Sequence, residues 1–389
     1  MNTKNIKTAL PDFAKPLKVR SSMDGLLESR PFEYTRRSSA LFVKAMRDAL
    51  AFQSGHSTFL RAYFKLEKFS PAELKSEKDV KKIPFVFVSA LKERDLTTLP
   101  ADRIALELKS SGTSGQKSRI QLDRDSLARV RRMAWKVFEG LGLTDLEHGH
   151  DYMCFTYDPE VARDAGTAWT DKLLTGFTGP GEIFYAFRWS REKKDFYFDV
   201  QNSAGRLRFF EESGRRVRLL GFPAFALKLL DEFKKIYGRN PRLNPDSSVI
   251  TGGGWKTLED KAMDKKIYRK ILANKLGIPV GNVRDLFGMV EHGVPYVDCR
   301  LGNFHIPNYG RVITRDPATL EPLGFGKTGL LQFMTPYLTS YPSLSLLSSD
   351  FGSVEEKCSC GIKGPVLRIK GRAGVKKLKG CAISATTML

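Results

Sequence analysis

The sequence predicts an α/β fold, and three observations carry that prediction. Strand-like segments, glycine-containing loops and amphipathic helical segments follow one another in that order several times along the chain. Apolar residues make up 41% of the 389 residues, which is enough for a substantial core. No internal repeat or low-complexity linker interrupts the pattern. We therefore expect several sheets packed by helices.

The first hundred residues are expected to be mostly helical, because apolar residues recur there at helical spacing. Alternation of apolar and polar side chains then marks a strand just before a loop rich in glycine and serine. The elements predicted in this part are a helix over 38–55, a short β-rich run at the start of 83–96, a strand over 103–109, and a helix that begins near Asp123 and runs through 125–142.

The rest of the chain repeats the order of strand, glycine-containing break and helix. The predicted elements are a strand, a Gly-Phe-Pro break and a helix over 214–238, a short strand running into three glycines over 247–256, a helix over 258–278, a strand and a tight polar turn over 282–293, and further strands in 327–336 and 364–372.

The formal net charge is +21. Such a charge predicts an acidic partner, which could be nucleic acid, anionic lipid, an acidic protein surface, a nucleotide or coenzyme A, or else a basic solvated surface. No nucleic-acid-binding motif is recognisable, so nucleic acid is the disfavoured partner. No segment approaches the length of about 18 apolar residues that a membrane helix needs, and the basic N-terminus lacks an apolar signal-peptide core. We therefore expect a cytoplasmic protein with no transmembrane segment.

Five cysteines form an odd set, and their spacing does not indicate a disulfide framework, so reduced thiols are expected. Cys358 and Cys360 form a Cys-Ser-Cys-Gly segment that could contribute two zinc ligands. The sequence shows no second pair, which favours a hairpin with two small buried thiols.

The loop Lys-Ser-Ser-Gly-Thr-Ser-Gly-Gln-Lys-Ser at 109–118 has the composition of a phosphate-binding loop. Its glycines let the backbone approach closely, its amides and hydroxyls can surround phosphate oxygens, and its lysine supplies charge. The spacing matches neither a P-loop nor a dinucleotide-binding loop. An ordinary flexible turn is the alternative.

This loop resembles the phosphate-binding loop of adenylate-forming enzymes, the superfamily of acyl- and aryl-CoA ligases, luciferases and peptide-synthetase adenylation domains. Thr-Gly-Gly-Gly-Trp-Lys, Leu-Phe-Gly-Met-Val-Glu-His, Ser-Ser-Asp-Phe-Gly and Arg-Ile-Lys-Gly-Arg follow and resemble later motifs of that superfamily in the same order. The resemblance implies that ATP is bound by Ser110, Ser111, Gly112, Thr113, Ser114, Gly115, Gly252, Gly253, Gly254, Phe287, Gly288, Asp350 and Arg372.

Within these motifs, the resemblance implies distinct roles. Phe287 would lie against adenine, Asp350 would bind the ribose hydroxyls, and Glu291 would be a catalytic residue that helps to hold Mg²⁺, a cation that favours such hard oxygen ligands. Lys117 would be catalytic, although it stands one place early and the usual proline is absent. His292 could lie at the mouth of the site or on the surface. The acyl pocket is expected between residues 150–200 and the glycine turn.

One branch of the superfamily, the acyl-protein synthetase or LuxE family, is similar in length, in its shortened phosphate loop and in having a cysteine near the C-terminus. This resemblance implies a large N-terminal adenylation domain over 1–371, a small C-terminal domain that is truncated or absent, and a short basic tail over 372–389 that carries Cys381. It further implies that a carboxylic acid, with a fatty acid favoured, is activated as acyl-AMP. The acyl group is then moved to Cys381 and on to a protein such as a reductase or carrier.

Cys381 follows Lys-Lys-Leu-Lys-Gly, and a thiolate with cationic neighbours is a competent nucleophile. An incidental exposed cysteine is the alternative. The second enzyme hypothesis is an acyl- or aryl-CoA ligase, or an acyl-AMP-dependent amide- or ester-forming enzyme, of the phenylacetate–CoA ligase type. Acylation retained on the protein without coenzyme A would favour the acyl-protein synthetase.

Overall fold

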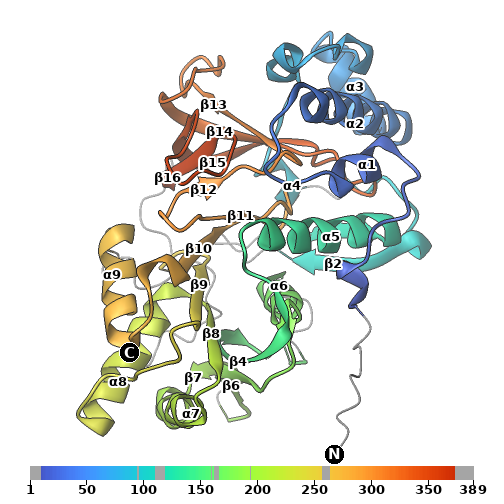
Figure 1. Cartoon of the computed structure of the whole chain (residues 1–389). Helices are drawn as coiled ribbons and strands as arrows, with labels where there is room; N and C mark the ends of the chain where they lie inside the picture. The colour runs from blue at the N-terminus through green and yellow to red at the C-terminus, as the bar shows by residue number, and fades with distance from the viewer. Residues whose placement is uncertain are drawn as a thin grey trace, which may run out of the picture.

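The structure is a computed structural model, and it describes residues 10–93, 96–109, 119–158, 160–161, 166–192, 194–255 and 263–372. Two large sheets and a two-stranded hairpin form its β-structure, with helices packed around them (Figure 1). This arrangement confirms the predicted α/β fold with several sheets.

The larger sheet is mostly parallel, with strand order β11-β10-β9-β8-β4-β6-β7 and the short β5 beside β4. Only the strands at its two ends, β11 and β7, pair antiparallel to their neighbours. Its strands are β4 (Asp145–Tyr157), β5 (Thr178–Gly179), β6 (Ile183–Ser190), β7 (Asp195–Phe198), β8 (Arg216–Gly221), β9 (Ser248–Gly252), β10 (Val283–Phe287) and β11 (Tyr296–Val297).

Both faces of this sheet are buried, as parallel sheets require. Along β4, Tyr152 and Cys154 contribute to one apolar cluster, and Met153 and Phe155 contribute to the other, because successive side chains point to opposite faces. One face is covered by α7 (Val200–Ser213), α8 (Pro223–Tyr237) and α9 (Lys265–Leu276), and the other by α6 (Gly166–Thr175) and α5 (Arg124–Gly140).

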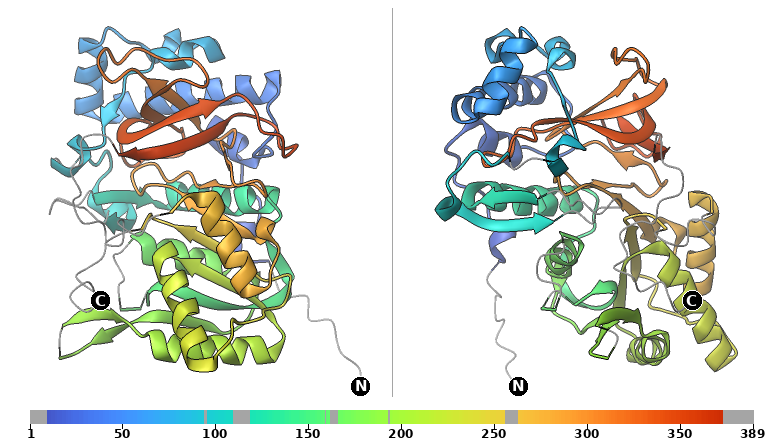
Figure 2. Two further views of the ribbon diagram at one scale, coloured as in Figure 1. Left: turned by 90° about the vertical axis from the view of Figure 1, so that its left-hand side faces the viewer. Right: turned by 180° about the vertical axis from the view of Figure 1, so that it is seen from behind.

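The second sheet follows the order β12-β16-β15-β14-β13 and is antiparallel, except that β1 pairs parallel with β15. Its strands are β1 (Val86–Phe87), β12 (Phe304–His305), β13 (Arg311–Arg315), β14 (Thr328–Met334), β15 (Ser345–Glu355) and β16 (Val366–Arg372). The N-terminal helices pack beside this sheet, at the end of the molecule away from α7 and α8 (Figure 2).

The N-terminal helices are α1 (Ser22–Glu28), α2 (Arg36–His56), α3 (Thr58–Leu66) and α4 (Ala90–Glu93), and single 3₁₀ turns lie at Asp12–Ala14, Pro71–Glu73, Glu77–Lys82, Ala101–Arg103 and Val280–Asn282. Within the described residues, no helix combines the length and the apolar character that crossing a bilayer requires.

Helix α5 lies between the two sheets and is held to α1 by buried ion pairs. Arg129 donates to Asp24 at 2.7 Å, and both side chains are less than a tenth exposed. Arg132 donates through two nitrogens to Glu28, each at 2.9 Å. The arginines are three residues apart on the helix and therefore face the same neighbour. These pairs fix the position of α5, which forms one wall of the pocket described below.

Most predicted elements are confirmed within a few residues, and two differ. Of the predicted helix over 258–278, residues 258–262 lie outside the described residues. The described helix α9 begins at Lys265, because the Asp264 side chain accepts hydrogen bonds from two first-turn amides and caps it there. The sequence did not predict β3 (Arg119–Asp123), which follows the glycine-rich loop and pairs with β2 (Ile104–Lys109). Asp123 is nevertheless the N-cap of α5, as expected.

Candidate active site

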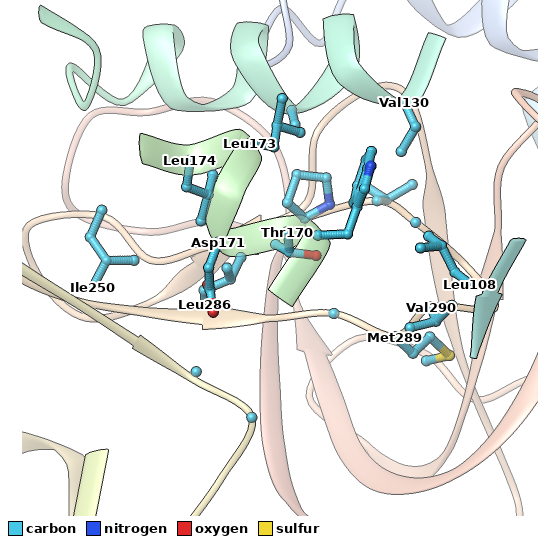
Figure 3. Close-up of a pocket in the computed structure, with 18 of the residues that line it drawn as sticks. Leu108, Val130, Thr170, Asp171, Leu173, Leu174, Ile250, Leu286, Met289 and Val290 are labelled. Carbon is cyan, nitrogen blue, oxygen red and sulfur yellow. The ribbon is translucent and has the colours of Figure 1, made fainter. Parts of the chain in front are cut away.

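An apolar pocket lies beyond the carboxyl ends of β8, β9 and β10, between the sheet and helices α5 and α6 (Figure 3). Its volume is about 200 Å³. Open parallel sheets bind ligands beyond the carboxyl ends of their strands, so the position suits a substrate. Trp169 and Leu174 line it on one side, and Gly252 and Gly253 on another. A pocket therefore lies where the sequence placed it, between residues 150–200 and the glycine turn.

The pocket has two distinct ends. Leu108, Met289 and Val290 lie on one side of the close-up, and Leu174 and Ile250 on the other (Figure 3). Leu108 is on β2, one residue before the strand ends at the glycine-rich loop. Val290 immediately precedes Glu291. One end of the pocket is therefore lined by residues that lead in sequence to the predicted phosphate-binding residues, and the other lies between α6 and β9.

The predicted phosphate loop connects the two strands of the hairpin, where Lys109 pairs with Arg119 across the ladder. Ser110, Ser111, Gly112, Thr113, Ser114, Gly115 and Lys117 lie outside the described residues. Leu108 and Leu122, on the two strands, line the pocket and tie the hairpin to it. The roles predicted for the loop residues remain predictions.

The glycine turn follows β9, and glycine is needed there for two reasons. A Cβ on Gly252 would come within 2.6 Å of the main-chain oxygen of Leu286 on the adjacent β10. Gly253 has φ of 75°, a conformation that side-chain-bearing residues seldom adopt. The turn thus keeps β9 and β10 close at their carboxyl ends and leaves a smooth backbone surface beside Gly288.

Phe287 ends β10 and is half-buried. Its ring packs against Tyr296, Phe304 and Phe333, with centroids 6.1, 6.2 and 5.8 Å away. Aromatic contacts at these distances hold the ring in place. Phe304 and Phe333 belong to the antiparallel sheet, so Phe287 packs where the two sheets meet. Part of its surface remains open to a ligand.

Glu291 lies in the turn after β10 and is only 5% exposed. Its carboxylate forms no hydrogen bond or ion pair with another described residue. Although the residue as a whole is buried, its carboxylate oxygens keep some contact with solvent, so the group is an available hard oxygen ligand for a cation. That property fits the Mg²⁺ role predicted for Glu291.

His292 is fully buried, so it lies neither on the surface nor at the mouth of a site. Its Nε2 is 2.7 Å from the Tyr296 hydroxyl, and its Nδ1 has no hydrogen-bond partner among the described residues. Burial lowers the pKa of His292 to about 3, so the ring is neutral at ordinary pH. It braces the turn that carries Glu291.

Asp350 and Arg372 face each other across β15 and β16 in register. Arg372 Nε donates to Asp350 Oδ1 at 3.4 Å. Asp350 is nearly buried, while the Arg372 side chain is 57% exposed. The structure therefore brings two predicted nucleotide-binding residues together on the antiparallel sheet. Among the described residues, no hydrogen bond or ion pair joins either of them to Phe287.

Charged residues that the sequence did not single out position β10. Lys265, in the first turn of α9, lies 3.1 Å from Asp285 and 3.2 Å from Asp298. Burial raises the pKa of Asp298, and the Lys265 ammonium opposes that rise. Arg284 donates to the main-chain oxygen of Asp298 at 2.8 Å. These four charged residues come from three separate places in a sequence rich in charged residues, so no sequence pattern could have predicted that they lie together.

Cys381 also lies outside the described residues. The other four cysteines divide into one buried thiol and a group of three. Cys154 is fully buried, and burial, with a smaller contribution from Asp171, raises the pKa of its thiol well above the usual value. Cys299, which the sequence did not connect with any partner, lies beside Cys358 and Cys360.

Comparisons with known proteins agree with this geometry. The family model described as acyl-protein synthetase, LuxE, matches residues 15–389. A protein of Vibrio harveyi named long-chain-fatty-acid–luciferin-component ligase is 28% identical over 309 residues, covering 79% of this chain and 78% of that protein. A protein of the same name from Aliivibrio fischeri is 26% identical over 314 residues, covering 80% and 79%.

Among solved structures, 2-hydroxyisobutyryl-CoA ligase in the postadenylation state, in complex with R3-HIB-AMP, is similar with a TM-score of 0.67. The two share 17% sequence identity, and the match covers 88% of this chain and 69% of that chain. At this identity the likeness concerns the fold. It shows that the strands and helices described above are arranged as in an adenylate-forming ligase.

Proposed function

The chain belongs to the LuxE acyl-protein synthetase family, and on that premise we propose that it activates a fatty acid with ATP and transfers the acyl group to a protein cysteine. The observation that carries the proposal is the apolar pocket, which lies between the glycine turn and the segment leading to Glu291. The names of the two bacterial relatives favour a long-chain acid and an acyl-accepting partner protein.

The shape and lining of the pocket indicate how a bound acid would be oriented. A hydrocarbon chain is stabilised by the apolar lining, at about 0.8 kcal/mol for each methylene removed from water. We assign its carboxylate to the end near Leu108 and Val290, the residues that lead in sequence to the glycine-rich loop and to Glu291. Its methyl end then points towards Leu174 and Ile250.

In the first half-reaction, a carboxylate oxygen attacks the α-phosphorus of ATP. The bond between that phosphorus and the bridging oxygen breaks, and pyrophosphate leaves with the electron pair. We assign adenine to the surface formed by the glycine turn and Phe287, and the ribose to Asp350 with Arg372 nearby. Lys117 and the amides of the glycine-rich loop are the expected donors to the phosphates.

Glu291 is the residue that would hold Mg²⁺. The fit rests on the absence of a cationic or hydrogen-bonding partner among the described residues, which leaves a hard oxygen ligand available. When bound, the cation would offset the negative charge of the phosphates.

In the second half-reaction, we assign the acceptor to Cys381. Its thiolate attacks the acyl carbon, a C–S bond forms, and the C–O bond to AMP breaks. The thiol proton goes to solvent. The four described cysteines suit this step poorly, because Cys154 is buried and the other three lie against one another and a histidine. The basic segment that carries Cys381 would also present the thioester to a partner protein.

Intact-protein mass spectrometry tests both half-reactions. The wild type would be incubated with ATP, Mg²⁺ and straight-chain acids of increasing length, without coenzyme A. We expect a mass increase of one acyl group that hydroxylamine removes. Cys381→Ser should abolish that increase and still release pyrophosphate, whereas Glu291→Gln should abolish both. Cys154→Ala is the matched control and should behave as the wild type.

Two outcomes would contradict the proposal. Retained acylation in Cys381→Ser would assign the acceptor to another residue. In the other outcome, the protein releases pyrophosphate without forming a protein adduct and makes an acyl thioester only when coenzyme A is added. That result would favour the CoA-ligase hypothesis.

A further inference from the structure

Three cysteines and a histidine from distant parts of the sequence meet at one point. They are Cys299, His305, Cys358 and Cys360, and their ligand atoms all lie within 4.8 Å of one another. Cys299 and His305 are fully buried, and the other two are partly buried. Such a group is unusual as simple core packing, because three thiols and an imidazole offer one another few hydrogen bonds.

The spacing of these atoms is within about 1 Å of that in tetrahedral coordination. Zinc binds cysteine sulfur at about 2.3 Å and histidine nitrogen at about 2.0–2.1 Å, so two sulfurs of one tetrahedron lie about 3.8 Å apart and a sulfur and a nitrogen about 3.6 Å apart. Here the sulfurs of Cys299 and Cys358 are 3.9 Å apart. Cys360 Sγ and His305 Nε2 are 3.2 Å apart.

Two turns supply these side chains. Cys299 follows β11 and opens a tight turn in which its amide donates to the Asn303 carbonyl at 2.9 Å. The turn leads into β12, which carries His305. Cys358 and Cys360 lie in the connection between β15 and β16. Because β12 pairs with β16, with His305 opposite Val366, the two turns are held side by side.

A second contact supports a bound cation. Asn303 donates from Nδ2 to Cys358 Sγ at 3.1 Å. Hydrogen bonds of this kind orient metal-bound thiolates and stabilise their charge. A disulfide is a poorer explanation, since the 3.9 Å between Cys299 and Cys358 is far beyond an S–S bond of about 2.05 Å.

We propose that Cys299, His305, Cys358 and Cys360 bind a structural Zn²⁺ ion. Soft thiolates with one imidazole are a donor set that selects zinc, and four protein ligands leave no position for a substrate. The ion joins the last strand of the parallel sheet to three strands of the antiparallel sheet. It thereby fixes β15 and β16, which carry Asp350 and Arg372, relative to the turn that carries Glu291.

Metal analysis of the full-length protein tests the proposal. After purification without chelators, elemental mass spectrometry should find about one zinc per chain, as expected for a closed four-ligand site. The double variant Cys358→Ser/Cys360→Ser should hold less than about a tenth of that amount. Cys154→Ala removes a buried thiol outside the cluster, so it is the matched control and should keep its zinc.

A measurement on the wild type tests the proposal even if the double variant fails to fold. Removing the metal with a strong chelator should lower the melting temperature, and adding Zn²⁺, but not Mg²⁺, should restore it. Protein produced with Co²⁺ should show the absorption of tetrahedral cobalt bound to thiolates. Zinc-free wild type that takes up no Zn²⁺ under reducing conditions would overturn the proposal. So would iron as the bound metal, or unchanged zinc in the double variant.

Discussion

Replacing Leu174 by phenylalanine should shorten the fatty acid that the pocket accepts. Leu174 lies on α6, is 2% exposed, and stands at the end of the pocket away from Leu108 and Val290. Phenylalanine adds three carbons to the side chain, so it occupies the space of about three methylenes of an acyl chain.

The expected size follows from that displacement. Three methylenes that lose their apolar contacts correspond to about 2.4 kcal/mol, or about 50-fold in kcat/KM, at about 0.8 kcal/mol each. The loss applies only to acids long enough to reach Leu174. Acids about three carbons shorter than the preferred substrate should keep their wild-type rate, because they never touch the substituted side chain.

Pyrophosphate release with a series of straight-chain acids measures this change. The control is Ile236→Phe on α8, which adds the same three carbons at a side chain that is 47% exposed and outside the pocket. It should leave the chain-length profile unchanged. A folded Leu174→Phe protein with a wild-type profile would refute the direction assigned to the acid, and an equal loss with every acid would indicate general damage.

Two further predictions concern the fold and the nucleotide. Arg129→Met should cost about 3–5 kcal/mol of unfolding free energy at pH 7, because it leaves the Asp24 carboxylate buried and unpaired. Burial alone would raise the pKa of Asp24, but Arg129 lowers it overall. The pair therefore contributes its full stabilisation above about pH 4, the unfolded pKa of an aspartate. Urea unfolding should show the difference in unfolding free energy from wild type narrowing as the pH falls below that value, through the lowered pKa of Asp24. Lys15→Met, at an exposed ion pair, should change little. Phe287→Leu keeps an apolar side chain but removes the aromatic face on which adenine would stack. It should therefore raise the KM for ATP about 5- to 150-fold and change the KM for the acid little. Equal increases in the two KM values would contradict adenine stacking.

Local patterns predicted the elements that surround the site. Asp123 was expected near the start of a helix because aspartate caps helix N-termini, and it caps α5. The glycines after β9 were expected to form a close backbone turn, and Gly252 does lie against β10. The sequence analysis did not predict the long strand β4. Both faces of this strand are buried, so apolar and polar residues do not alternate along it.

Contacts between distant segments could not be predicted in the same way. Cys358 and Cys360 suggested half of a metal site, and the sequence offered no second pair. The structure supplies Cys299 and His305, separated from that pair by more than fifty residues, because β12 pairs with β16. In the sequence, a cysteine and a histidine with five residues between them do not by themselves indicate a metal site. They do so only once strand pairing brings them next to the two cysteines of the other turn.

The location of this cluster explains how a site divided between two sheets can stay assembled. Phe287 ends a strand of the parallel sheet and Glu291 lies in the turn after it, while Asp350 and Arg372 belong to the antiparallel sheet. Aromatic packing of Phe287 on the antiparallel sheet holds one side of the junction. The proposed zinc ligands hold the other, since β11 leads into one turn and β15 into the other. Neither contact needs to touch a substrate to keep the two halves of the proposed nucleotide site at a constant separation.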